Sequence, residues 1–293
     1  MSDPLYFRLE TTDYKFYLTI SKGVGADTVS IGGKKGECVN VAINTPESLA
    51  VKREYHFIDT ATIPILAWDS KCAIDKDLAK GSGTIAMINT VLSETMKRYS
   101  YVKVFTFTDN SHITCSNGKE ISLLPLSVIE YGKTWYERHF NAFIDDSNLN
   151  RKYKNGIKIM NDPELKMSFT DFKNTIKSYT NASTVESLKP HYESSATYFM
   201  FFKSILDMVG KTGLCILVID WIDMFILHIF QFNPNGALWA IRSSSIGPVQ
   251  IENETQLTKK PRNQNGGGAE YIRRGISQGR VNINDILEYE WSL

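Results

Sequence analysis

Hydrophobic and polar residues alternate along the first 70 residues in the way that β-strands require. Five segments rich in β-branched and aromatic residues are separated by short stretches rich in turn-forming residues, and each is predicted as a strand. They read LYFRLE (5–10), YKFYLTIS (14–21), ECVNVAI (37–43), EYHFIDT (54–60) and IPILAWD (63–69). The pattern predicts a meander of antiparallel strands.

The hydrophobic period then changes to that of an α-helix between residues 84 and 99. The apolar face of this helix is formed by Ile85, Ile88, Val91, Leu92, Thr95 and Met96. YVKVFTFTD (101–109) alternates again as a strand, and residues 122–140 are predicted as a helix with a break at Tyr131–Gly132. This order of strand, loop, helix, strand and helix predicts a mixed α/β (α+β) fold, with a mostly antiparallel sheet and flanking helices.

The pattern changes after the polar stretch DDSNLNRKYKNG (145–156), which predicts a boundary near residue 150. Residues 168–179 and 194–211 predict amphipathic helices, the second ending at Gly210. The apolar run 213–230 and GALWAIR (236–242) are predicted as strands. We therefore expect an α/β domain over residues 1–150, a second, smaller α/β part over 151–245 and an extended C-terminal arm over 246–293.

Charge and composition exclude some classes of partner. The formal net charge of the 293 residues is +1, so the whole chain has no strong attraction to nucleic acid or to an anionic membrane. Between residues 259 and 280, six cations face one anion, Glu270, and Tyr271 is the single aromatic residue among them, which disfavours nucleic acid binding. The apolar run 213–230 is too short to span a membrane and is interrupted by Asp220 and Asp223.

The C-terminal segment predicts a contact with protein. The polar stretch KKPRNQNGGGAE (259–270) cannot bury apolar area, but the chain ends in the hydrophobic INDILEYEWSL (283–293). A hydrophobic end beyond a polar connector predicts docking, either on this chain or on another protein subunit. The residues expected to bind the partner are Arg273, Arg274, Tyr289 and Trp291.

The four cysteines are far apart, and none lies in a C-x-x-C pair or at zinc-ligand spacing from a histidine. We expect them to be small buried residues, which favours an intracellular, reducing compartment. No metal site is predicted. Asp109, Ser111 and His112 are neighbours in sequence, and we interpret them as a turn rather than a catalytic triad.

A glycine pair at the predicted start of the helix at 84–99 is the first candidate site. KGSGT comprises Lys80, Gly81, Ser82, Gly83 and Thr84. A helix N-terminus has unpaired N–H groups and a partial positive charge, and glycines let a pyrophosphate approach the backbone. The same residues also fit a turn that begins a helix without binding a ligand. No Gly-Lys-Ser/Thr follows, which excludes a Walker A loop.

Together with WYERHF (135–140), this loop resembles the GNAT-type acyltransferase family over about residues 50–145. In that family a central strand leads to a glycine loop at a helix start, and a later helix carries a Tyr-Glu-Lys-x-Gly-Phe-like motif. The resemblance implies that Gly81 and Gly83 contact the pyrophosphate of acetyl-CoA, with Thr84 at the helix start. It implies that Tyr136 is the general acid that protonates the leaving thiolate, although Tyr136 also fits a core aromatic residue.

The sequence departs from the family where Leu78 replaces an Arg or Gln and His139 replaces a glycine, and no general base is fixed by the pattern. The composite from residue 105 to 140 also resembles segments of proteins encoded by large nucleocytoplasmic DNA viruses. We therefore expect a structural protein without a cofactor, such as a minor capsid or virion-associated protein that contacts a capsid lattice through its C-terminal arm. The alternative is an active acetyl-CoA-dependent N-acetyltransferase.

Overall fold

The computed structural model describes residues 3–33, 36–45, 60–66, 82–109, 111–259 and 281–282. The described residues form two compact units. Of the described residues, the first unit contains those up to Phe107 and those between Ala240 and Glu290, and the second contains those of Thr108–Trp239. The division therefore falls at residues 107 and 239, whereas the sequence pattern predicted boundaries near 150 and 245.

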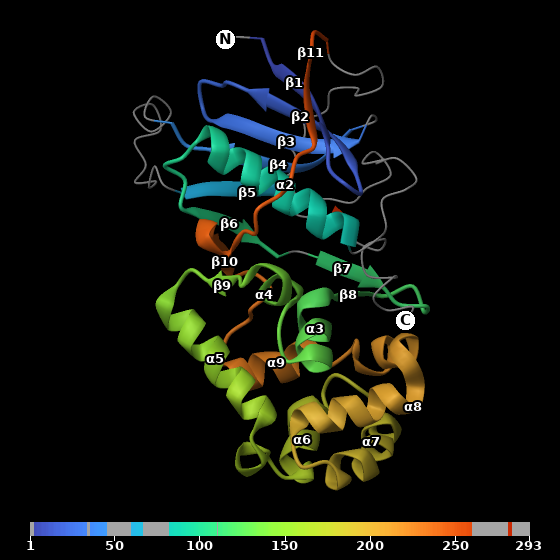
Figure 1. Cartoon of the computed structure of the whole chain (residues 1–293). Helices are drawn as coiled ribbons and strands as arrows, with labels where there is room; N and C mark the ends of the chain where they lie inside the picture. Colours follow the sequence, from blue (N-terminus) through green and yellow to red (C-terminus); the bar gives the residue numbers. More distant parts are fainter. Residues whose placement is uncertain are drawn as a thin grey trace. The chain divides into compact units, whose positions relative to one another are not determined.

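A large, mostly antiparallel sheet forms the first unit (Figure 1). The strand order is β11-β1-β2-β3-β4-β5-β6-β10. Strands β1 to β5 pair antiparallel in sequence order, β11 pairs antiparallel with β1, and β5 pairs parallel with β6. The strands are β1 (Leu5–Glu10), β2 (Lys15–Ser21), β3 (Asp27–Gly33), β4 (Gly36–Ile43), β5 (Thr60–Leu66), β6 (Val104–Thr108), β10 (Leu238–Arg242) and β11 (Asn253–Leu257).

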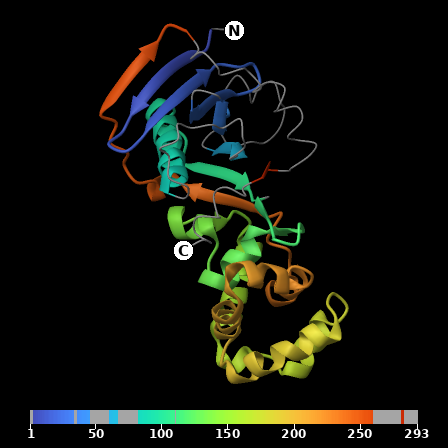
Figure 2. The same ribbon diagram turned by 90° about the vertical axis from the view of Figure 1, so that its right-hand side faces the viewer.

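Helix α2 (Ser82–Arg98) lies between β5 and β6 in the chain and packs on β3 and β4, on one face of the sheet (Figures 1 and 2). Its buried face follows the predicted period and includes Ile88, Val91 and Leu92. The sheet contributes a layer of β-branched and aliphatic side chains to the same core, namely Leu9, Phe16, Leu18, Val29, Ile31, Val39, Val41 and Ile43. Removing this apolar surface from water is the main source of stability for the unit.

Strand β11 corrects the expectation of an extended arm from residue 246. Residues 253–257 pair with β1, and Figure 2 shows β11 at the edge of the sheet. The Glu254 carboxylate accepts hydrogen bonds from Lys97 Nζ at 2.9 Å and Arg98 Nη2 at 2.9 Å, both at the end of α2. These contacts fix a polar strand that hydrophobic periodicity alone did not reveal.

The second unit is mainly helical. Its helices are α3 (Leu123–Tyr131), α4 (Trp135–Phe140), α5 (Ser147–Asn161), α6 (Phe169–Ile176), α7 (Ala182–Ser194), α8 (Tyr198–Val218) and α9 (Ile222–Phe230). Its short strands are β7 (Ser111–Thr114), β8 (Glu120–Ser122) and β9 (Phe143–Ile144). The Phe172 ring lies at the centre of an aromatic core and contacts Tyr192, Phe201, Trp221 and Phe225. A single-turn 3₁₀ helix spans Pro163–Leu165 in this unit, whereas the 3₁₀ helix Ser243–Ser245 and β12 (Val281–Asn282) belong to the first unit.

Two predictions for this part of the chain are wrong. The polar stretch 145–156 belongs largely to α5, whose start is capped by the Asp146 carboxylate and whose buried face carries Tyr153, Gly156 and Met160. The apolar run 213–230 forms the end of α8 and all of α9 rather than strands. Both a short buried helix and a buried strand produce a continuous run of apolar residues, so hydrophobic periodicity could not distinguish the two. The strand predicted at 236–242 is confirmed as β10.

The cysteines are also not the unpaired residues that we expected. Cys115 and Cys215 form a disulfide bond across a sequence separation of 100 residues, and Cys38 is disulfide-bonded as well. Spacing could not reveal these bonds, because the connectivity of disulfides cannot be deduced from sequence alone.

Candidate functional site

Of the predicted cofactor loop, the structure describes the residues from Ser82 onward, which form the start of α2. Ser82 and Gly83 begin the helix, and Gly83 and Thr84 are buried. Lys80 and Gly81 lie outside the described residues. The helix follows a parallel-sheet strand, β5, and precedes its parallel neighbour, β6. As at any helix start, the first backbone N–H groups of α2 have no acceptor within the helix itself.

The Thr84 hydroxyl is a buried polar group without a partner. Its residue is 1% exposed, and Oγ1 makes no hydrogen bond within the part of the chain that the structure describes. Leaving a buried hydroxyl unpaired costs about 1–3 kcal/mol. The first turn of α2 carries no acidic side chain, so the positive end of the helix dipole is not neutralised from within the helix. Both observations concern the helix start at which the sequence predicted an anion-binding loop.

The later motif, WYERHF, forms α4 and is held by a capping box. Thr134 Oγ1 accepts a hydrogen bond from the Glu137 backbone N–H at 3.2 Å, and Glu137 Oε2 accepts one from the Thr134 N–H at 2.9 Å. The same carboxylate oxygen accepts a short hydrogen bond from the Tyr153 hydroxyl on α5. Glu137 is therefore a structural residue that fixes α4 to its neighbour.

Tyr136 is buried, with 7% of its surface exposed. Burial raises the pKa of its phenol well above the ordinary value, and the nearby Asp109 carboxylate raises it further. A general acid works best when its pKa lies near that of the group it protonates, which is about 8.5 for a thiol. The Trp135 ring packs edge-on against the Tyr136 ring at 5.0 Å between centroids. The geometry favours a core aromatic residue over an accessible proton donor.

Asp109 and Ser111 form the turn that the sequence predicted. Asp109 Oδ1 accepts hydrogen bonds from the Ser111 N–H at 3.0 Å and from the Ser111 hydroxyl at 2.5 Å. Burial raises the pKa of the Asp109 carboxyl, while these two hydrogen bonds and the nearby His112 lower it by a smaller amount. Asp109 and Ser111 therefore have the contacts of an Asp turn, and His112 follows in β7.

An ion pair between α3 and α8 was missed from the sequence. Lys211 Nζ lies 3.1 Å from Glu130 Oε1, and both side chains are largely buried. The second oxygen, Glu130 Oε2, is buried and makes no hydrogen bond to any described residue. A lone Glu at the end of the apolar sequence LLPLSVIEY was the available signal, because a charge within a buried helix needs a partner.

The predicted partner residues Arg273, Arg274, Tyr289 and Trp291 lie outside the described residues. Across the ranges that the structure covers, no group of three or more His, Cys, Asp or Glu side chains is arranged to hold a metal ion. In the same ranges, no single helix is long and apolar enough to cross a membrane; α8 and α9 meet that criterion only as a pair bent by 84°. Comparisons with protein-family models, curated proteins and solved structures find no match to this chain.

Proposed function

We propose that this chain is a structural or interaction protein on an acyltransferase-like fold, and that its C-terminal segment binds neighbouring protein subunits. The observation that carries this proposal is the burial of Tyr136 in a helix whose other polar contacts are structural. The sequence resemblance to proteins of large nucleocytoplasmic DNA viruses supports a virion as the setting, with the chain acting as a minor capsid or virion-associated protein.

The order of elements supports the acyltransferase-like part of the proposal. Strand β5 leads to α2, whose start carries Ser82 and Gly83, and α2 leads to the parallel strand β6 and then to α4. This is the order of central strand, glycine loop, helix, strand and later helix on which the resemblance rests. A fold can persist when its chemistry is lost, so this order supports the fold and leaves activity to be tested.

A second candidate function is an acetyl-CoA-dependent N-acetyltransferase, which is favoured by the unpaired Thr84 hydroxyl at the start of α2. In that reaction a base removes a proton from an amine, the amine nitrogen attacks the thioester carbonyl, and Tyr136 protonates the departing thiolate. The sequence pattern fixes no general base; Glu54, His56 and Asp59, on the strand predicted at 54–60 where a base could sit, lie outside the described residues.

Release of free CoA from acetyl-CoA separates the two candidates. The thiol is measured with the purified chain and a panel of amines containing a polyamine, a lysine peptide and an aminoglycoside. The structural proposal predicts no release above the rate without protein. Release that disappears in Tyr136→Phe, a substitution that removes only the hydroxyl, would establish the enzyme instead.

The role of the C-terminal segment is tested through association of the chain with itself. Sedimentation velocity is measured for the wild type, for Tyr289→Ser/Trp291→Ser and for Arg273→Glu/Arg274→Glu. We expect a concentration-dependent oligomer that both double variants weaken, while the control Tyr289→Phe/Trp291→Phe retains it. Identical sedimentation of the wild type and both disruptive variants would contradict a binding role for these residues.

A further inference from the structure

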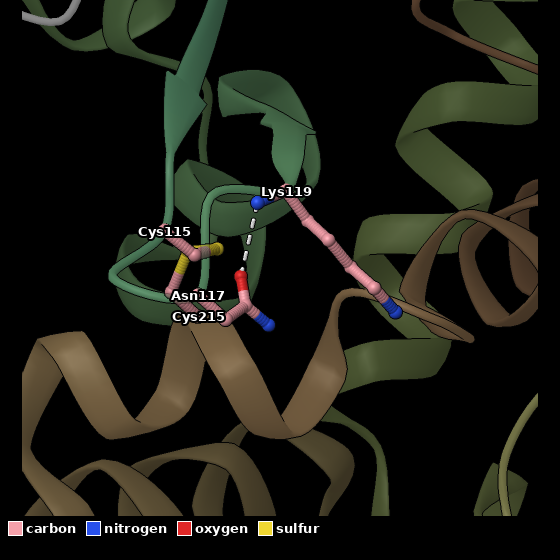
Figure 3. The surroundings of a disulfide bond; sticks show 4 residues. All are labelled: Cys115, Asn117, Lys119 and Cys215. Atoms are coloured by element: carbon pink, nitrogen blue, oxygen red, sulfur yellow. Dashed lines mark hydrogen bonds between the residues drawn. A yellow bond between two sulfur atoms is a disulfide. The ribbon is translucent and has the colours of Figure 1, made fainter.

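The Cys115–Cys215 disulfide joins the turn of a β-hairpin to a helix of the same unit (Figure 3). Cys115 directly follows β7, and Cys215 lies in the second half of α8. Their Cα atoms are 5.8 Å apart, within the range that an unstrained disulfide requires. Both residues are buried, with exposed fractions of 5% and 2%.

Among the described residues, β7 packs on α3, and an ion pair lies close to the disulfide. Strands β7 and β8 share three residue pairs, and hairpins this short are marginally stable without further packing. The turn is shaped by its own backbone, since Gly118 has φ +79° and the Cys115 N–H donates to the Lys119 carbonyl at 2.8 Å. The nearby ion pair between Lys119 Nζ and Asp220 Oδ1, at 2.5 Å, is about half exposed on both sides and contributes little.

On the helix side, the disulfide holds the segment that follows a break in α8. Gly210 has φ +68° and ψ 176°, so it interrupts the helix, and the preceding Met208 is 53% exposed. Beyond the break, Lys211 pairs with Glu130 of α3 and Cys215 bonds to Cys115. The half-helix after Gly210 is therefore fixed by one ion pair and one covalent bond, in addition to its buried apolar side chains.

We propose that Cys115 and Cys215 are substrates for a thiol–disulfide exchange partner, which closes this bond during folding and thereby locks the β7–β8 hairpin onto α8. One cysteine thiolate attacks the disulfide of the donor and expels one donor thiolate. The second cysteine thiolate then attacks the mixed disulfide and expels the other. The two protons released by the cysteines convert the donor thiolates to thiols, so two electrons pass from the chain to the donor.

Burial decides when this exchange takes place. Exchange requires an in-line approach of a third sulfur to the bond, and neither Cys115 nor Cys215 offers that access in the folded chain. The donor must therefore act on an incompletely folded or locally opened chain. Once the hairpin has packed, the same burial protects the bond from reduction.

The experiment uses the full chain, unfolded and reduced, and refolded with a glutathione redox mixture as the disulfide donor. Free thiols are alkylated and the cross-linked peptides are identified by mass spectrometry. We expect a Cys115–Cys215 peptide, and we expect dithiothreitol to reduce it at least tenfold more slowly in the folded chain than in urea. Free thiols at both positions after refolding, or equal reduction rates in the two states, would overturn the proposal.

Hydrogen exchange tests the lock itself. In Cys115→Ala/Cys215→Ala, we expect the amides of residues 111–122 to exchange at least tenfold faster than in the oxidised wild type, while those of α2 in the other unit are unchanged. The matched control is Cys38→Ala, which removes the disulfide-bonded cysteine of β4 in the other unit and should leave the hairpin amides as they are. Unchanged exchange of the hairpin in the double variant would refute the lock.

Discussion

Glu137 offers the sharpest test of the conclusion that the WYERHF motif is used for packing. One carboxylate oxygen, Oε2, accepts hydrogen bonds from the Thr134 N–H and from the Tyr153 hydroxyl. Tyr153 is 2% exposed and its ring stacks on Phe230 with 5.3 Å between centroids. Glu137→Ala removes the acceptor for both donors, and the buried Tyr153 hydroxyl loses the group to which it donates.

The cost of Glu137→Ala follows from these two contacts. Loss of a capping interaction costs about 0.5–2 kcal/mol, and a buried hydroxyl left unsatisfied costs about 1–3 kcal/mol. We therefore expect the free energy of unfolding to fall by about 2–4 kcal/mol. Glu137→Gln keeps an oxygen acceptor and loses only the charge, so its loss should be about 1 kcal/mol.

The assay is urea unfolding followed by tryptophan fluorescence, because Trp135, Trp221 and Trp239 all lie in the second unit. Tyr153→Phe completes a double-mutant cycle. In the Tyr153→Phe background no hydroxyl is left to be orphaned, so Glu137→Ala should cost about 1–2 kcal/mol less than in the wild type. A Glu137→Ala variant within 0.5 kcal/mol of the wild type, or strictly additive effects, would refute the reasoning, given that about 0.5 kcal/mol is the usual limit of additivity.

Two further predictions concern packing and charge in the same unit. A Cβ atom on Gly156 of α5 would lie 2.5 Å from Phe230 Cε1 and 2.7 Å from Cγ. Gly156→Ala should therefore lower the free energy of unfolding by about 1–2 kcal/mol, although alanine has the higher helix propensity. The control is Gly247→Ala, because a Cβ at Gly247 meets nothing within 4 Å. If Gly156→Ala is as stable as the wild type or more stable, the close packing of Gly156 on Phe230 is contradicted. Burial raises the pKa of the Asp109 carboxyl in the folded chain. Between the unfolded pKa, about 4, and the folded pKa, the folded chain therefore holds a proton that the unfolded chain has lost. As the pH rises through this window, the contribution of Asp109 lowers the free energy of unfolding. Asp109→Asn keeps an acceptor for Ser111 and should gain stability relative to the wild type from acid to neutral pH, whereas parallel pH profiles of the two unfolding free energies would contradict the assignment.

The elements with a clear period were predictable from the sequence. Strand β2 and helix α2 each have a buried face, so the pattern of residues 14–21 and the helical spacing of residues 84–99 were sufficient. The helix predicted over residues 168–179 is present as α6, and the Ser168 side chain caps its start by accepting a hydrogen bond from the Asp171 N–H. Gly210 was predicted to end a helix and does break α8, because its positive φ is unfavourable for other residues.

Elements whose sequence has no clear hydrophobic period could not be predicted without knowledge of their tertiary contacts. Helix α9 is apolar nearly all round because it lies within an aromatic core, so its sequence also fitted a buried strand. Strand β3 has polar and glycine residues, and its pairing with both neighbours determines its conformation. The disulfide and the Glu130–Lys211 pair join residues far apart in the chain, and single-residue patterns carry no information about such contacts.

The two motifs on which the acyltransferase resemblance rests differ in their contacts. In α4, the Glu137 carboxylate is engaged by hydrogen bonds, and Tyr136 and Phe140 are buried in the core. At the start of α2, the Thr84 hydroxyl is buried and has no partner within the described residues. An unpaired buried hydroxyl is retained at a cost, so Thr84→Val should be neutral or stabilising in the free chain and should weaken any stabilisation by acetyl-CoA. If Thr84→Val leaves that stabilisation intact, the hydroxyl does not contact the cofactor, and binding and catalysis must then be argued from other residues.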